Sequence, residues 1–174
     1  RTERYAYDER GNVLVHTSAD GAKTLYEYDP RGLVVAATDP LGKRATFEYD
    51  QAGRMVQTTD CTGGRESFLY NEHGQLVTVR DALGRETHQA YSAQGDLVAT
   101  TDPNGTTTTY EYDDLGRLIG VTWPGGARHQ LTLGPDDLPL TSTDAEGRTT
   151  RYTRDADGRL LRIENPNGGI YSFD

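Results

Sequence analysis

Residues 110–118 read YEYDDLGRL, and residues 47–55 repeat the pattern as FEYDQAGRM. The pattern returns every 21 residues from Tyr5 to Ser172 without insertion or deletion, which makes eight repeats. A fixed period of this length indicates a repeat architecture in which each copy is one small supersecondary element. We place the repeats at 5–25, 26–46, 47–67, 68–88, 89–109, 110–130, 131–151 and 152–172.

Every repeat carries two turn tetrads, at positions four to seven and fourteen to seventeen, and at each place five of the eight copies have the form Asp-x-x-Gly. Aspartate in such a tetrad accepts a main-chain N–H bond, and glycine adopts the left-handed conformation that ends the turn. The tetrads therefore predict hairpins closed by a type I turn and a glycine bulge. The predicted turn residues are Asp8, Gly11, Gly21, Asp29, Gly32, Asp39, Gly42, Asp50, Gly53, Gly63, Gly84, Gly105, Asp113, Gly116, Gly126, Gly147 and Gly168.

The segments between the tetrads are rich in Thr, Tyr and Val, as residues 107–112 and 54–59 illustrate. We therefore predict an all-β fold of tandem hairpins, with about sixteen strands in one long antiparallel sheet. Such a sheet should curl, because open twisted sheets rarely exceed about ten strands. Helices are disfavoured, since a glycine falls about every ten residues.

An odd repeat length constrains the register, because side chains alternate between the two faces of a strand. We expect tyrosine at position three to lie opposite position nine, and the second turn of each repeat to shift the register through a longer loop or a bulge. Position ten, apolar in every repeat, then falls on the other face. Neither face is predicted to be cleanly polar or apolar.

Composition excludes several classes of protein. The net charge of −9 disfavours nucleic acid and anionic membranes as partners. A single cysteine, Cys61, excludes an internal disulfide and a cysteine-based metal cage. No segment is apolar for long enough to span a membrane as a helix, and residues 1–11 lack the pattern of a signal peptide. Because the sequence starts within the pattern, we interpret the chain as a fragment of a larger protein.

Candidate chemical groups are few, and we predict no catalytic residue, metal or cofactor. The repeated aspartates invite a calcium hypothesis, but the short Gly/Asp nonapeptide of calcium-binding rolls is missing, and each aspartate has a turn role. The four histidines stand at different phases of the repeat, so they form no recurring ligand set; they are His16, His73, His88 and His129. Cys61 fills a turn position and is interpreted as a neutral substitution. No common hydrolase, nucleotide-binding or zinc-protease motif occurs.

The string Tyr-x-Tyr-Asp-x-x-Gly-Arg-Leu at residues 110–118, in eight registered copies, resembles the RHS/YD-repeat family. That family includes bacterial polymorphic toxins and type VI secretion effectors, the C component of insecticidal toxin complexes, and animal teneurins. The resemblance implies a spiral β-shell, which in the toxin members is secreted and encloses a C-terminal toxin domain. The core motif for self-cleavage that closes bacterial shells is absent from this sequence, so no protease residue is carried over.

Two further expectations concern particular segments. The seventh repeat, residues 131–151, departs most from the pattern, which predicts a local bend or an irregular strand there, and the irregularities cluster between residues 120 and 140. The tyrosine column offers a second hypothesis, an adhesion module that stacks on carbohydrate or a cell-surface partner through Tyr28, Tyr49 and Tyr112, although cross-strand tyrosine more often serves packing. The partners expected for a shell segment are its own toxin domain and further repeats, and an isolated segment should self-associate through unpaired edge strands.

Overall fold

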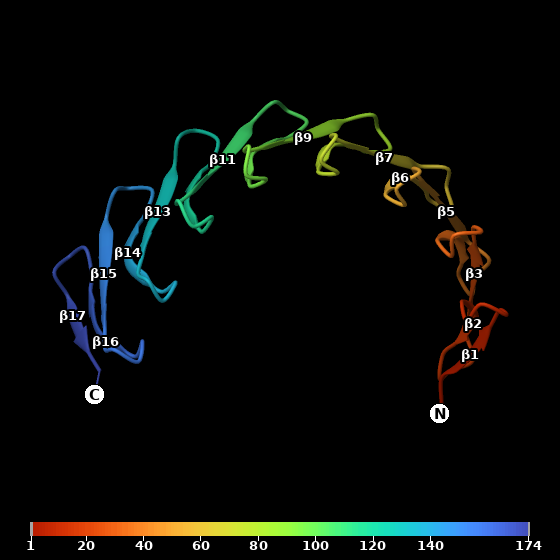
Figure 1. Ribbon diagram of the computed structural model, residues 1–174, viewed down its shortest axis with the longest axis horizontal. Coiled ribbons are helices and arrows are strands. Elements are labelled where there is room, and N and C mark those ends of the chain that lie inside the picture. The colour runs from red at the N-terminus through yellow and green to blue at the C-terminus, as the bar shows by residue number, and fades with distance from the viewer. Residues whose placement is uncertain (1, 174) are drawn as a thin grey trace. The chain divides into compact units, whose positions relative to one another are not determined.

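The computed structural model describes residues 2–173, and these contain seventeen strands and no helix. The strands belong to one antiparallel sheet, which confirms the predicted fold class. The chain divides between Thr87 and His88 into two compact parts, here called the N-terminal half and the C-terminal half. In Figure 1 each half is a curved strip of hairpins that follow one another in sequence order.

Each repeat supplies one longer and one shorter strand. The odd-numbered strands are β1 (Arg4–Tyr7), β3 (Lys23–Tyr28), β5 (Arg44–Tyr49), β7 (Arg65–Tyr70), β9 (Glu86–Tyr91), β11 (Thr107–Tyr112), β13 (Arg128–Leu133), β15 (Thr149–Arg154) and β17 (Ile170–Ser172). The even-numbered strands are β2 (Val13–Thr17), β4 (Val34–Thr38), β6 (Met55–Thr59), β8 (Leu76–Arg80), β10 (Leu97–Thr101), β12 (Leu118–Thr122), β14 (Pro139–Thr143) and β16 (Leu160–Glu164).

Two turns alternate along the chain and share one geometry. The first turn, at positions four to seven, is represented by residues 29–32, where Asp29 N–H donates to Leu33 O at 2.9 Å and Gly32 N–H donates to Asp29 O at 3.0 Å. The second turn, at positions fourteen to seventeen, repeats these bonds in residues 39–43 at 2.9 and 3.0 Å. The last residue of both turns is left-handed, with φ of 85° at Gly32 and 78° at Gly42, a conformation that favours glycine.

The register shift lies beside the first turn, so its expected place in the second turn was wrong. In the hairpin of β3 and β4, Tyr28 pairs with Val34 as expected, but Glu27 pairs with Ala36, which leaves Val35 as the extra residue of a β-bulge. All eight first-turn hairpins shift at this point. Seven second-turn pairings, from β2–β3 to β6–β7 and from β10–β11 to β16–β17, run without a shift. The bulge accommodates the residue that makes the repeat length odd, because it places two residues of one strand opposite one residue of the other.

The bulge also decides which positions of the repeat share a face. Positions one and three pair with positions twelve and nine, while positions two and twenty-one pair with positions eleven and thirteen. Directly paired residues share a face, so one face collects most of the aromatic residues, and the other is mainly polar, with Leu25 and Leu69 as apolar exceptions. We call these the aromatic face and the polar face. Position ten joins the aromatic face at Val98, which lines one groove with Tyr110 and Tyr112, so its expected place on the other face was wrong there.

The seventh repeat keeps regular strands, and the expected bend or irregular strand between residues 120 and 140 is not found. Leu133 pairs with Pro139 in the same register as in the other repeats. Asp137 replaces the turn glycine and takes its left-handed conformation, with φ of 62°. Aspartate tolerates this region better than most residues, and the strands on either side hold the turn closed.

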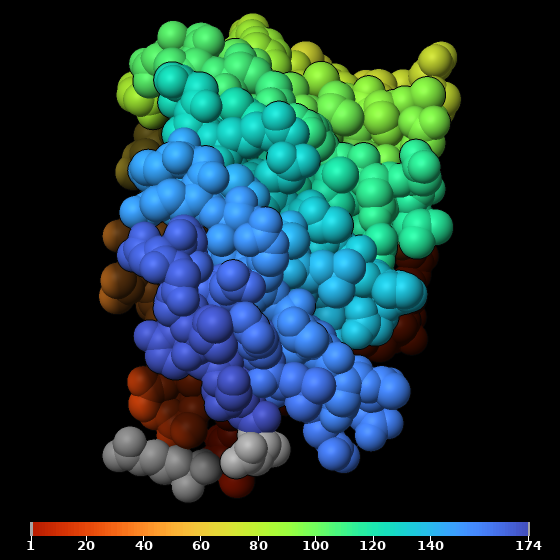
Figure 2. Space-filling view, turned by 90° about the vertical axis from the view of Figure 1, so that its left-hand side faces the viewer, coloured from red at the N-terminus to blue at the C-terminus, as the bar shows by residue number. Residues whose placement is uncertain are grey.

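The described sheet is a single layer with almost no conventional core. Ala36 is the one buried apolar residue among residues 2–173, with 1% of its surface exposed. Figure 2 shows the C-terminal half, coloured green to blue, with no other element over the face in view. Stability must therefore come from contacts between neighbouring hairpins, as in other repeat proteins.

The Gly84→Ala substitution tests the turn conformation without a steric clash. Gly84 has φ of 77°, and an added Cβ would meet nothing within 4 Å. We expect the free energy of unfolding in urea to fall by about 1 kcal/mol, since the left-handed conformation is strained for alanine. Gly169 is the matched control, because its φ is not in this range and its added Cβ would make only an ordinary contact at 3.9 Å. Equal effects of the two substitutions would contradict the turn assignment.

Candidate functional site

Four tyrosine hydroxyls at position three tie their hairpins to the ones before them. The side chain of Tyr49 on β5 donates its hydroxyl proton to Val34 O on β4 at 2.8 Å. The same bond, fifteen residues back along the chain, is made by Tyr28 to Val13 at 2.9 Å, Tyr70 to Met55 at 2.8 Å and Tyr112 to Leu97 at 3.1 Å. These four rings are half-buried. A buried tyrosine hydroxyl needs such a partner.

The acceptor carbonyl is free because neighbouring hairpins separate toward their first turns. Pairing between β4 and β5 covers three residue pairs next to the second turn and stops at Ala36 and Thr46. Val34 therefore has no ladder partner on β5, and Tyr49 reaches across the gap with its side chain. An unsatisfied main-chain carbonyl in this half-buried position would cost stability, so the hydroxyl serves as a substitute ladder bond.

The sequence contains a signal for this bond between hairpins, which the prediction of packing or carbohydrate binding did not include. Position one accepts both Tyr and Phe, as Tyr26 and Phe47 show, whereas the aromatic residues at position three are all tyrosine. A ring without a hydroxyl would serve packing equally well. The preference at position three therefore reflects the hydrogen bond rather than the ring.

The turn aspartates accept hydrogen bonds from within their own turns. In the turn that begins at Asp60, its Oδ1 accepts the N–H of Thr62 at 2.8 Å, the Thr62 hydroxyl at 2.7 Å and the N–H of Gly64 at 2.9 Å. The Thr62 hydroxyl bond is the largest cause of the lowered pKa of Asp60. Hydrogen bonds from the same turn lower the pKa in the same way at Asp8, Asp29, Asp50, Asp81, Asp102, Asp113 and Asp144.

Arginines on the first turns bridge to the next hairpin. The guanidinium of Arg10 donates to Pro30 O at 2.8 Å, and that of Arg31 donates to Asp50 O at 2.7 Å. Arg117 donates to Gly134 O at 2.7 Å and to Asp137 at 2.8 Å, in the one repeat pair where Leu133 stands in place of the tyrosine. Arg54 lies over the ring of Tyr70, with its central carbon 4.8 Å from the ring centroid. We call these four residues the bridging arginines.

Ion pairs on the polar face span one intervening strand. Arg44 on β5 donates to Glu27 on β3 at 2.8 Å, across Ala36 on β4. Arg128 and Glu111 form the same pair at 2.6 Å across the buried Gly120. A small residue at position eleven makes room for the two long side chains, which explains why Ala36 is buried.

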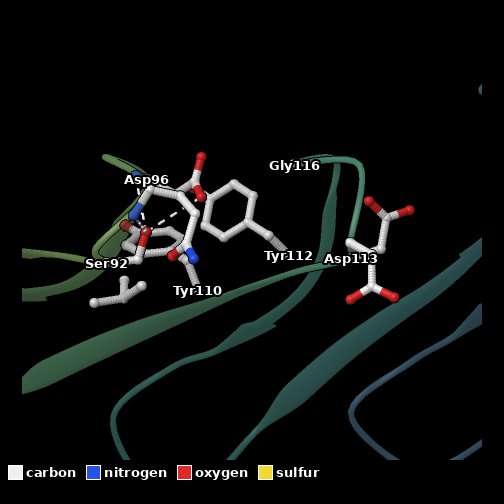
Figure 3. Close-up of a pocket in the computed structure, with 9 residues that line it drawn as sticks. Ser92, Asp96, Tyr110, Tyr112, Asp113 and Gly116 are labelled. Atoms are coloured by element: carbon white, nitrogen blue, oxygen red, sulfur yellow. Dashed lines mark hydrogen bonds between the residues drawn. The ribbon is translucent and has the colours of Figure 1, made fainter.

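One open groove of about 610 Å³ lies between two successive first turns of the C-terminal half. Its floor is formed by Val98, Tyr110 and Tyr112, and its rim by turn residues that include Ser92, Gln94, Asp96, Asp113 and Asp114. In Figure 3 the ring of Tyr112 lies between Asp96 on one side and Asp113 on the other. Asp96 accepts a hydrogen bond from the Ser92 hydroxyl at 3.2 Å.

The remaining candidate residues do not gather into one site. His16 stacks on Tyr5 with centroids 4.8 Å apart, while His129 lies 2.9 Å from Ser142 Oγ and His73 lies 3.7 Å from Glu72. Within residues 2–173, no three His, Cys, Asp or Glu side chains are grouped so that they could hold a metal ion. Cys61 is exposed.

No helix within the described range is both long enough and apolar enough to cross a membrane.

Comparison with known proteins gives one family match and several structural likenesses. The family model described as Teneurin YD-shell matches residues 1–173. No curated protein matches the sequence. The crystal structure of TcdB2-TccC3-TEV is similar with a TM-score of 0.60 and 17% identity, over 98% of this chain and 12% of that one. The crystal structure of TcdB2-TccC3 gives a TM-score of 0.55 and 17% identity, over 99% of this chain and 12% of that one. At this identity the likeness shows the fold alone, and the chain spans only a small part of these proteins.

The Tyr49→Phe substitution removes one hairpin-to-hairpin bond and keeps the ring. We expect the free energy of unfolding to fall by about 1 kcal/mol, because Val34 O loses its partner. Tyr26→Phe is the matched control, since Tyr26 lies at position one of the preceding hairpin, which supplies Val34 O, and no hydrogen bond of its hydroxyl is found in the described structure. Urea unfolding of both variants measures the difference. An equal loss of unfolding free energy in both would show that the Tyr49 hydroxyl bond does not stabilise the fold.

Stability should fall in acid, because the turn aspartates have lowered pKa values. A carboxylate whose folded pKa lies below its ordinary value of 3.8 stabilises the fold above that pH, and the contribution is lost as pH falls through the folded pKa. We expect the urea midpoint to drop between neutral pH and about pH 3. Asp60→Asn should reduce the drop, since asparagine keeps the acceptor oxygen, as Asn71 does with the N–H groups of His73 and Gln75 at 3.0 Å. A midpoint that does not change with pH would refute the electrostatic role of these residues.

Proposed function

Because the chain belongs to the teneurin YD-shell family, whose fold is a structural shell, we propose that it forms a section of the wall of a bacterial RHS toxin shell. The observation that carries this proposal is the repeated tyrosine bond between hairpins, such as Tyr49 to Val34 O. It joins hairpin to hairpin in a single-layer sheet whose one buried apolar residue, among those described, is Ala36. A thin wall of this kind separates two compartments without needing a core.

The proposed wall encloses a C-terminal toxin domain until delivery from a secreted protein. This part of the proposal comes from the sequence resemblance to polymorphic toxins and type VI effectors. The mechanism is physical sequestration, in which the toxin domain and the remaining repeats of the same protein are the partners. No catalytic group, metal or cofactor is needed for this role, and we propose none.

The open edges are the surfaces at which further repeats would add. Within the described chain, β1 is paired only with β2, and β17 is paired only with β16. Unpaired strands offer main-chain donors and acceptors to another strand. We propose that further repeats of the same protein cover these edges, and that the isolated segment self-associates through them.

The adhesion hypothesis has less support from the same geometry. Tyr28, Tyr49 and Tyr112 each use the hydroxyl for a main-chain carbonyl of the preceding hairpin, and their rings are half-buried. A tyrosine that stacks on sugar has to expose its ring face. Of these three rings, that of Tyr112 also lines an open groove, so the column as a whole is better suited to join hairpins than to bind carbohydrate.

A glycan array separates the two functions. We expect the chain to bind no glycan, and the Tyr28, Tyr49 and Tyr112 to Phe triple variant to unfold at lower urea concentration because three bonds are lost. In the full-length protein, the C-terminal domain should resist added protease until the shell is unfolded. Glycan binding that the triple variant abolishes without loss of stability would support adhesion instead, and a C-terminal domain cleaved as fast as free toxin would refute enclosure.

A further inference from the structure

The groove beside Tyr112 lies where other repeats place a bridging arginine. Positions six and eight of the first turn supply these arginines, as Arg31 and Arg54 show. In the fifth repeat the same positions hold Gln94 and Asp96. No guanidinium of the chain is among the residues that line this groove, and about 610 Å³ stays open.

The nearest equivalent in the protein shows what the space is shaped to hold. Arg54, at position eight, lies 4.8 Å from the ring centroid of Tyr70, at position three of the next repeat. Asp96 and Tyr112 occupy the same two positions two repeats further along, so an acid replaces the cation there. The ring of Tyr112 is held in place by its hydroxyl bond to Leu97 O at 3.1 Å.

The charges around this ring are unbalanced. Asp96 is half-buried and is bonded to the neutral Ser92 hydroxyl at 3.2 Å. Asp114 is exposed and has no hydrogen bond or ion pair within residues 2–173. Asp113 is already neutralised by Arg117, whose Nε donates to it at 2.7 Å. Two carboxylates of the groove therefore lack a cation, and burial together with the Asp96 charge raises the pKa of Tyr112.

We propose that this groove binds the guanidinium of an arginine side chain from a basic polypeptide, with the plane of the group on the Tyr112 ring and its N–H groups on Asp96 and Asp114. Arginine fits better than lysine because its flat group stacks on an aromatic ring while it bonds carboxylates from its edge. The net charge of −9 favours a basic partner at longer range. The inference rests on the groove alone and does not depend on an enclosed toxin.

The test uses the 174-residue chain and a blocked Gly-Gly-Arg-Gly-Gly peptide, followed by NMR of the Tyr112 ring and the Gly116 amide. We expect saturable shifts of both signals. The citrulline peptide, which has the same shape without the charge, should bind about tenfold more weakly or not at all, because a charge-assisted bond is lost. Asp96→Asn should weaken binding of the arginine peptide by about tenfold for the same reason.

Two more variants keep the result specific. Asp96→Arg gives this repeat its own bridging arginine, so it should abolish peptide binding and raise the melting temperature. Glu9→Gln removes one exposed charge from another first turn and should change the affinity less than twofold, since distant surface charges are screened. The proposal is overturned if the arginine peptide gives no saturable shift, if citrulline binds equally well, if Asp96→Arg binds like the native chain, or if Glu9→Gln weakens binding as much as Asp96→Asn.

Discussion

The β-bulge beside every first turn carries the extra residue that a 21-residue repeat requires. Without it, an odd period would move tyrosine to the opposite face in each successive repeat, because side chains alternate along a strand. With it, Tyr28 and Tyr49 lie on one face, each opposite a residue at position nine of its own hairpin. The aromatic and polar faces both follow from this one local distortion.

The same region leaves a main-chain acceptor for the next hairpin. Val34 follows the first turn and has no partner on β5, so its carbonyl is available to the Tyr49 hydroxyl. The bond replaces ladder pairing where the hairpins separate. The tyrosine bond thus gives this single-layer sheet a stabilising contact between hairpins. In a two-layer fold, packing of one sheet on another would supply such stabilisation.

The gaps between hairpins are also where the repeats differ in chemistry. Arg10, Arg31, Arg54 and Arg117 fill such gaps with the chain's own cations, whereas Asp96 leaves one of them acidic and open. Variation at positions six and eight costs little backbone stability, because the turn bonds are made by the main chain and the first turn residue. The repeat can therefore vary the side chains in these gaps while its hairpins stay the same.

The sequence alone determined the repeat, the strands and the turns, because local rules govern them: position seventeen demands glycine, and the strand segments alternate with it at a constant spacing. The opposition of positions three and nine also followed from turn geometry. The location of the bulge did not follow from the sequence. An extra residue at either turn would keep tyrosine on one face, and only the main-chain pairing shows which turn carries it. The partners of Tyr49, the Glu27–Arg44 pair above Ala36 and the open groove at Asp96 join residues of successive hairpins. Only the tertiary structure decided them, because they depend on how far neighbouring hairpins separate and not on any local preference.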